Sequence, residues 1–79
     1  MTARPAKRSL TSAGHKTSLT LEPAFWEALK DVAQSRAQSI AALVAEIDAG
    51  RAPGVEGLSS SVRVYLLDHF RAMAEGTAP

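Results

Sequence analysis

Residues 15–33 read HKTSLTLEPAFWEALKDVA, and within this stretch the pattern of apolar side chains changes from a period of two to a helical period. In its first seven residues, alternate side chains point to opposite faces of a predicted strand. Lys16, Ser18 and Thr20 share the polar face, and a threonine and two leucines share the other. We therefore predict a strand over about residues 15–21, with one solvent face and one core face.

A helix follows this strand directly and begins at a proline. Proline is tolerated at the first helical position because the amide that it lacks would have no partner there. Apolar side chains then recur at helical spacing, at Phe25, Trp26, Leu29, Val32 and Ala33. The pattern predicts a helix over about residues 23–35.

The predicted strand needs partners for its backbone donors and acceptors. An isolated strand edge favours pairing with another molecule, because each unpaired backbone group costs free energy when it is buried. We find no second strand of comparable quality in the sequence. We therefore expect the partner strand to come from a second copy of the chain.

Two further helices are predicted in the rest of the chain. Ser39 suits the N-cap of a helix over about residues 40–49, and Gly50 suits a left-handed residue that closes it. Proline and glycine mark residues 51–57 as a loop. A third helix, over about residues 60–74, is apolar around most of its circumference, so we expect it to be covered on two sides.

Charge is divided unevenly along the chain. Residues 1–20 hold four basic side chains and no acidic one, whereas residues 21–79 hold five basic and eight acidic ones. Apart from the first residue, residues 1–13 carry one large apolar side chain, Leu10, so we predict a basic, flexible arm ahead of a domain over residues 14–79. Such an arm suits a polyanion, and a solvated tail is the alternative.

Composition excludes several classes of protein. With 79 residues the chain forms one domain at most, and without cysteine it has neither disulfides nor thiolate metal sites. No apolar run approaches the roughly 20 residues that span a bilayer, and the first residues are unlike a signal peptide, so we expect a soluble, cytoplasmic protein without membrane contact. Asp68 and His69 point in different directions on a helix and lack further ligands, so we expect no enzyme, metal site or cofactor.

The order of strand, proline-opened helix and serine-capped helix is continuous over residues 16–47, KTSLTLEPAFWEALKDVAQSRAQSIAALVAEI. This stretch resembles the ribbon-helix-helix family of bacterial transcriptional repressors and antitoxins. A subgroup of small members with an added C-terminal helix is similar to GHKTSLTLEPAFWEAL, AALVAEIDAGR and LSSSVRVYLLDHFR of this chain. The resemblance implies a mainly α fold with one N-terminal strand and three helices. It also implies an intertwined homodimer, in which two strands pair into an antiparallel ribbon.

In the family, this ribbon lies in the DNA major groove, which is wide enough for two strands. Carried over by position, the base-reading residues are Lys16, Ser18 and Thr20. The DNA phosphate contacts implied are at the start of the second helix, at Ser39, Ile40 and Ala41. From their charge and position we also expect phosphate contacts at Arg8 and His15, and an ordinary surface residue is the alternative for His15. The dimer core implied is Leu19, Leu21, Trp26, Leu29, Leu43, Ile47, Leu66 and Phe70. A left-handed residue before the second helix, glycine in many members, falls on Ala37.

The resemblance implies a homodimeric DNA-binding transcriptional regulator, whose partners are a second copy and double-stranded DNA. The alternative is a protein-interaction module, an antitoxin or adaptor, in which the third helix or the basic arm binds a partner protein. For Lys16, Ser18 and Thr20, the alternative is an ordinary solvent-facing side of a strand.

Overall fold

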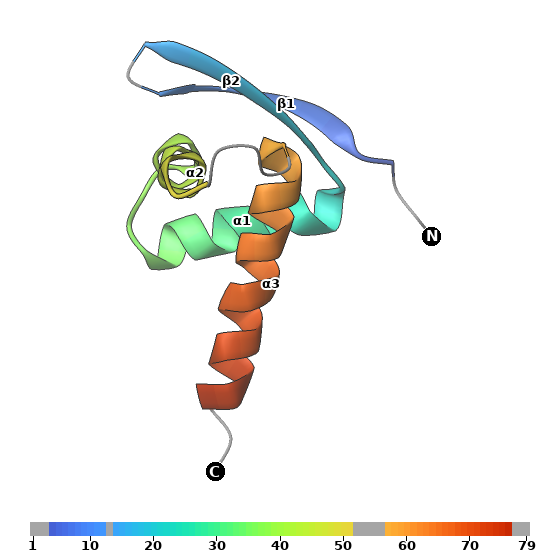
Figure 1. Ribbon diagram of the computed structural model, residues 1–79, viewed down its shortest axis with the longest axis vertical. Coiled ribbons are helices and arrows are strands. Elements are labelled where there is room, and N and C mark those ends of the chain that lie inside the picture. The colour runs from blue at the N-terminus through green and yellow to red at the C-terminus, as the bar shows by residue number, and fades with distance from the viewer. Residues whose placement is uncertain (1–3, 13, 52–56, 77–79) are drawn as a thin grey trace.

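A computed structural model describes residues 4–12, 14–51 and 57–76 of the chain, which contain a β-hairpin and three helices (Figure 1). The elements are β1 (Ala6–Ser12), β2 (His15–Leu21), α1 (Pro23–Ser35), α2 (Ile40–Ala49) and α3 (Leu58–Gly76). The hairpin lies across one side of the helices, and α3 extends away from the hairpin toward the C-terminus. The fold is mainly helical, as predicted.

The prediction of a single strand is wrong, because β1 pairs antiparallel with β2 in the same chain, in a register that runs from Ala6↔Leu21 to Ser12↔His15. Two residues connect the strands, and Gly14 has a φ of 81°, a left-handed conformation that glycine adopts without steric cost. Residues 6–12 are therefore a strand and no flexible arm, and β2 obtains its missing partner without a second copy. The first three residues of the expected arm, and residue 13, lie outside the described residues.

The two faces of β2 have the polarity that its alternating sequence predicts. Leu19 and Leu21 are buried, whereas Lys16, Ser18 and Thr20 are exposed. Burying a leucine side chain stabilises a fold by about 1.5 to 3 kcal/mol, so the apolar face holds the hairpin on the helices. The polar face is left toward solvent.

One chain buries a core of its own. Its fully buried residues are Leu19, Leu21, Leu29, Val32, Ala33, Leu43, Val44, Val62 and Leu66. Of the eight residues expected in a dimer core, five belong to this single-chain core, and Trp26 and Ile47 pack against it. Phe70, at 41%, is the one of the eight whose side chain is exposed in the single chain.

The turn between α1 and α2 contains a left-handed residue, as the resemblance implies. Ala37 has a φ of 56°, and the amide of Gln38 donates to the carbonyl of Ala33 at 2.9 Å. Hydrogen bonds of this kind, with a left-handed residue after the last helical turn, form a Schellman motif. The Ser39 hydroxyl then caps α2, because it accepts a hydrogen bond from the amide of Ala42 at 3.0 Å.

Two expectations for the later helices need correction. Gly50 follows α2 with a φ of −84°, so it closes the helix in a right-handed conformation. Within the described residues, α3 is covered on one side, where Val62 and Leu66 are buried. Its other side leaves apolar side chains in solvent: Val64, Leu67, Phe70 and Met73 are 41 to 56% exposed.

A polar cluster fixes the three helices to one another at the end of α1. Arg36 donates to the hydroxyl of Tyr65 in α3 at 2.7 Å and to the carboxylate of Glu46 in α2 at 3.1 Å. The Gln38 amide group donates to the second carboxylate oxygen of Glu46 at 2.9 Å. The hydroxyl of Tyr65 therefore takes part in packing α3 against the end of α1. The two hydrogen bonds to Glu46 hold α2 in place beneath the hairpin.

Candidate nucleic-acid interface

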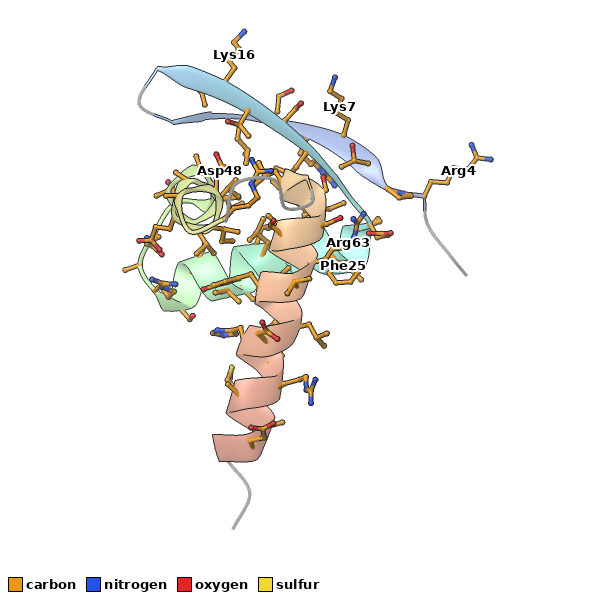
Figure 2. All side chains as sticks on the ribbon, viewed as in Figure 1. Arg4, Lys7, Lys16, Phe25, Asp48 and Arg63 are labelled. Carbon is orange, nitrogen blue, oxygen red and sulfur yellow. The ribbon has the colours of Figure 1, made fainter. Side chains whose placement is uncertain are left out.

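The side of the hairpin that faces away from the helices is polar, and we call it the outer face. Its six exposed side chains are Lys7, Ser9, Thr11, Lys16, Ser18 and Thr20. Figure 2 shows Lys7 and Lys16 projecting away from the helices, with Arg4 beyond the start of β1. A shallow depression of about 290 Å³ lies here, and five of the six outer-face residues line it, together with Thr17.

The outer face combines residues from both strands in opposed pairs. The register places Lys7 opposite Thr20, Ser9 opposite Ser18, and Thr11 opposite Lys16. Residues 7–11, KRSLT, and residues 16–20, KTSLT, differ at one position, and this repeat is a signal for β1 within the sequence. Sequence reasoning found the three residues on β2 and missed the three on β1.

The outer face carries positive charge with no carboxylate among its six residues. The nearest acidic residue along β2 is Glu22, whose carboxylate lies 3.0 Å from the guanidinium of Arg63. The backbone amide of Glu22 and the hydrogen bond from Arg63 hold the pKa of this carboxyl below its ordinary value. Glu22 is therefore ionised at neutral pH and compensated by an arginine, so the two lysines dominate the charge of the outer face.

Arg8 does not lie on the outer face. It belongs to the inner side of β1, is half-buried, and holds its guanidinium 4.6 Å from the centroid of the Trp26 ring. A guanidinium over an indole is a favourable cation–π geometry. Within the described residues, its buried Nε has no hydrogen-bond partner. The arginine therefore anchors the hairpin to α1, and the structure does not bring it beside Lys16.

The other residues expected to contact DNA phosphates are His15, whose side chain is outside the described part of the chain, and three residues that lie apart from the outer face. The backbone of His15 pairs with Ser12, and its side chain is outside the described part of the chain. Ser39, Ile40 and Ala41 form the start of α2, where first-turn amides have no partner within the helix. The Ser39 hydroxyl is engaged in capping, so backbone amides are the groups that α2 offers to an anion.

The edge of β2 that faces away from β1 is covered at one end by α3. The amide of Thr20 donates to the Ser59 hydroxyl at 2.8 Å, and Arg63 donates to the carbonyl of Thr20 at 3.2 Å. In an antiparallel strand, backbone groups two residues apart point to the same edge. Lys16 and Ser18 therefore direct their backbone groups to this edge beyond the part that α3 covers.

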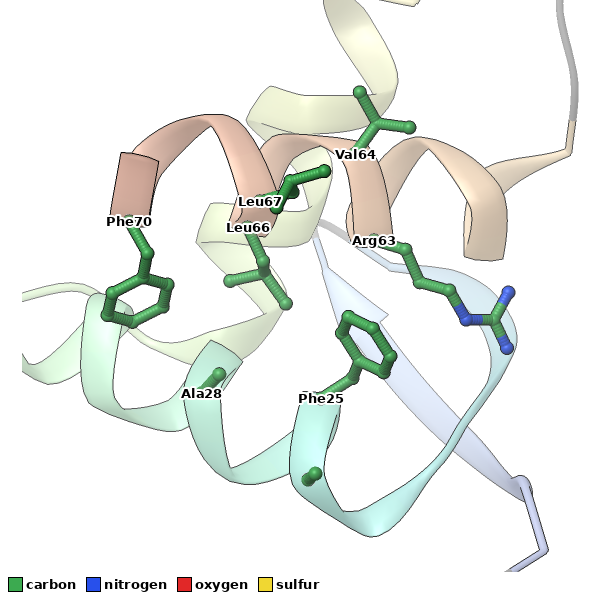
Figure 3. A pocket seen from close by; sticks show the side chains of 8 residues that line it. Phe25, Ala28, Arg63, Val64, Leu66, Leu67 and Phe70 are labelled. Atoms are coloured by element: carbon green, nitrogen blue, oxygen red, sulfur yellow. The ribbon is translucent and has the colours of Figure 1, made fainter. Parts of the chain in front are cut away.

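An apolar groove of about 400 Å³ lies between α1 and α3, on another side of the molecule (Figure 3). Its lining residues are Ala24, Phe25, Ala28, Arg63, Val64, Leu66, Leu67 and Phe70. The guanidinium of Arg63 lies 5.8 Å from the centroid of the Phe25 ring, at the end of the groove nearest β2. Chemically, this groove offers apolar contact and no catalytic group.

His69 lies in the second half of α3, beside two aromatic side chains. Its ring stacks on Tyr65 with centroids 6.1 Å apart and meets the edge of Phe70 at 5.1 Å. Among the described residues, no group of three or more histidine or acidic side chains is placed to hold a metal ion. His69 is therefore part of an aromatic cluster on α3.

The model of the ribbon-helix-helix domain family matches residues 5–70, and the match includes both strands and most of α3. The chain belongs to the ribbon-helix-helix family. Members of this family are generally DNA-binding regulators or antitoxins, typically form dimers, and are typically not enzymes. Comparison with curated proteins and with solved structures found no match. Within the described residues, no helix has both the length and the apolar character that crossing a membrane requires.

Proposed function

We propose that this ribbon-helix-helix protein binds double-stranded DNA through the outer face of the β1–β2 hairpin and acts as a transcriptional regulator. The observation that carries the proposal is the outer face itself, six exposed side chains with two lysines, four hydroxyls and no carboxylate. The DNA major groove is about 12 Å wide and admits a two-stranded ribbon. The hairpin presents such a ribbon, so the fit is steric as well as electrostatic.

The side chains of the outer face suit contact with base edges. An ammonium group such as that of Lys16 donates to O6 and N7 of guanine, and the hydroxyls of Ser18 and Thr20 donate or accept toward several bases. These three residues are the expected base contacts, and their exposure on one face supports that role. Lys7, Ser9 and Thr11 join them from β1.

Contacts with DNA phosphates are proposed for groups around the outer face. We retain His15 and the first-turn amides at Ser39, Ile40 and Ala41, because a helix N-terminus attracts anions. Arg4, which is exposed beside the start of β1, is added to this set. Arg8 does not belong to the proposed phosphate contacts, because its guanidinium packs on the Trp26 ring.

We propose that the regulator is a homodimer whose second copy covers the exposed side of α3. An apolar patch of this kind marks a contact surface, because apolar side chains in water raise the free energy of the isolated chain. Leu67 is 56% exposed and Phe70 41% exposed beside the groove. The same groove favours the second candidate function, an adaptor or antitoxin that binds a different protein.

The DNA proposal is tested by titrating duplex DNA with a double variant, Lys16→Glu and Ser18→Glu, at several salt concentrations. We expect affinity to fall at least tenfold, because the variant adds two carboxylates and removes one ammonium group, which lowers the charge of a face that meets phosphates by three units. The matched control combines Arg71→Glu with Gln34→Glu, which makes the same charge change on exposed positions of α3 and α1. Binding that survives in the hairpin variant contradicts the proposal.

The homodimer is tested by measuring the native mass of the full chain and of Leu67→Glu. We expect two chains for the wild type and one for the variant, since a carboxylate buried in an apolar contact is strongly unfavourable. Asp68→Ser is the control, because Asp68 is exposed and does not line the groove. A wild-type mass of one chain contradicts the homodimer and leaves a different protein as the partner of the groove.

A further inference from the structure

We propose that two copies of the chain pack their α3 helices antiparallel, along the exposed apolar side of each, so that one assembly holds two duplex segments at opposite ends. The inference rests on the proposed function, from which it takes the second copy at α3 and the DNA contact of the outer face. It adds the direction of the second copy and what that direction does to DNA.

The exposed side of α3 carries a continuous stripe of apolar side chains. Its members recur at every third residue and are 41 to 56% exposed: Val64, Leu67, Phe70 and Met73. Residues three apart are neighbours on a helix surface, so the stripe is about 14 Å long at about 1.5 Å per residue. Three of its members also line the groove between α1 and α3 (Figure 3). A helix laid along the stripe therefore places apolar side chains in the groove as well.

Two charged side chains flank the stripe and select the direction of the partner helix. Asp68 follows Val64 by four residues, and residues four apart are neighbours on a helix surface. Arg71 follows Leu67 in the same way, so both charges lie on one flank of the stripe. Both are exposed, and within the described residues the side chain of neither makes an ion pair. An antiparallel copy of α3 brings opposite charges together here, whereas a parallel copy brings like charges together.

The stripe and the charged pair have nearly the same centre, as a two-fold axis between two copies requires. The stripe is centred between Asp68 and His69, and the two charges between His69 and Phe70. The centres are one residue apart, or about 1.5 Å along the helix. One axis perpendicular to α3 therefore sets Leu67 against Phe70 of the second copy and each aspartate near an arginine. Such a self-complementary surface is the usual interface of a homodimer.

The direction of α3 relative to the hairpin determines where the outer faces lie. Lys7 and Lys16 project from the hairpin in the direction opposite to that in which α3 extends from it (Figure 2). A two-fold axis perpendicular to α3 reverses this direction in the second copy, so the two outer faces point away from each other. Leu58, the first residue of α3, lies about 11 residues from the axis, so the two helix starts are about 33 Å apart.

This arrangement leaves the DNA contacts of both copies free. A straight duplex meets one outer face and not the other, so the second face is available to another duplex segment. The contact along α3 also uses no residue of the hairpin, so the strands remain available for pairing between copies. The antiparallel pair of α3 helices therefore joins two DNA-binding ends.

The first experiment tests the direction of the helices with two charge-reversal variants. We expect Asp68→Arg and Arg71→Asp each to weaken self-association at least fivefold, because both charge pairs across the axis then repel. An equimolar mixture should regain the affinity of the wild type and form mainly heterodimers, which native mass spectrometry separates by mass. Glu27→Arg and Lys30→Asp are the matched control, because they reverse an exposed pair at the same spacing on α1, outside the groove. They should associate like the wild type, alone and mixed.

The second experiment tests whether one assembly holds two duplexes. A mixed-sequence duplex of about 20 base pairs is fixed to a surface at low salt, the full chain is added, and capture of a second, labelled duplex is measured. We expect the wild type to capture the second duplex. Leu67→Glu should capture at least fivefold less and still bind the fixed duplex, because its outer face is intact.

The outcomes separate this inference from the proposed function. If both reversal variants self-associate like the wild type, or if their mixture associates no better than each alone, the antiparallel α3 pair is refuted while DNA binding stands. A wild type that binds the fixed duplex and captures no second one refutes it as well. If the wild type binds no duplex, the proposed function fails and the inference fails with it. Thermal unfolding of each variant, expected to match the wild type at these exposed positions, excludes loss of the fold as the cause.

Discussion

The side-chain oxygen of Ser59 accepts a hydrogen bond from the backbone amide of Thr20 at 2.8 Å, across 39 positions of the chain. This contact joins the first turn of α3 to the edge of β2, and Arg63 completes it by donating to the carbonyl of Thr20. Exposed strand edges are places at which other chains add. α3 therefore both packs on the core and limits the edge that β2 offers to a neighbour.

Replacing Ser59 by alanine removes the acceptor and leaves the Thr20 amide without its partner. We expect Ser59→Ala to lower the free energy of unfolding by about 1 kcal/mol. The Thr20 amide should also exchange its hydrogen with solvent faster than in the wild type. Ser60→Ala is the matched control, because Ser60 occupies the next position of the same helix turn. Equal stability and equal exchange in the two variants would show that the hydrogen bond contributes nothing.

Arg8 and Lys7 are adjacent, but their side chains lie on opposite faces of β1. Arg8→Met keeps an apolar stem and loses the contact with Trp26, so we expect stability to fall by about 0.5 to 1 kcal/mol. Fluorescence reports this change directly, because Trp26 is the only tryptophan of the chain. Lys7→Met, on the outer face, should leave stability and fluorescence unchanged and weaken DNA binding. The reverse assignment of effects would contradict the placement of both side chains.

The sequence predicted the elements whose pattern reflects burial most directly. Leu19 and Leu21 alternate with polar residues because one side of β2 faces the core, and the proline after Glu22 marks the start of α1. β1 escaped prediction because its inner face presents Arg8 where an apolar residue is typical. The aliphatic stem of that arginine and the face of an indole replace an ordinary apolar contact there.

Only the β2 half of the outer face could be predicted from the sequence, because β1 was not recognised as a strand. Lys16, Ser18 and Thr20 follow from the alternation of one strand, whereas Lys7 and its neighbours on β1 join the outer face through the pairing register. Sequence patterns also do not distinguish a core residue from one that lines a groove, because both are apolar and recur at helical spacing. Phe70 therefore falls in the expected core set although it is 41% exposed.

The left-handed backbone at Ala37 is a strained position that one substitution relieves. A side chain with a Cβ costs on the order of 1 to 2 kcal/mol in this conformation, and glycine does not. Glycine also raises the entropy of the unfolded chain, which offsets part of the gain. We expect Ala37→Gly to raise the free energy of unfolding by about 0.5 to 1 kcal/mol. Denaturant unfolding measures it, with Ala45→Gly in the exposed part of α2 as a control that should destabilise by a similar amount.

The ion pair of Glu22 with Arg63 makes stability depend on pH in a defined direction. The pKa of Glu22 is lowered in the folded chain, first by its own backbone amide and then by Arg63, from an ordinary value of 4.5. A carboxyl whose pKa is lower in the folded state binds protons more readily when unfolded, so its stabilising contribution is complete above the unfolded value. The contribution is lost as the pH falls below about 4.5 and through the lower folded value.

Glu22→Gln should therefore be less stable than the wild type at pH 7, and the difference should shrink as the pH is lowered toward 3. Denaturant unfolding at constant ionic strength over this range measures both chains under the same conditions. Glu27→Gln is the control, because Glu27 meets Lys30 at 3.3 Å on an exposed surface, where an ion pair contributes little. If the difference in the free energy of unfolding between Glu22→Gln and the wild type stays constant with pH, the charge of the carboxylate contributes nothing. Glu22 would then act through its shape and hydrogen bonds alone.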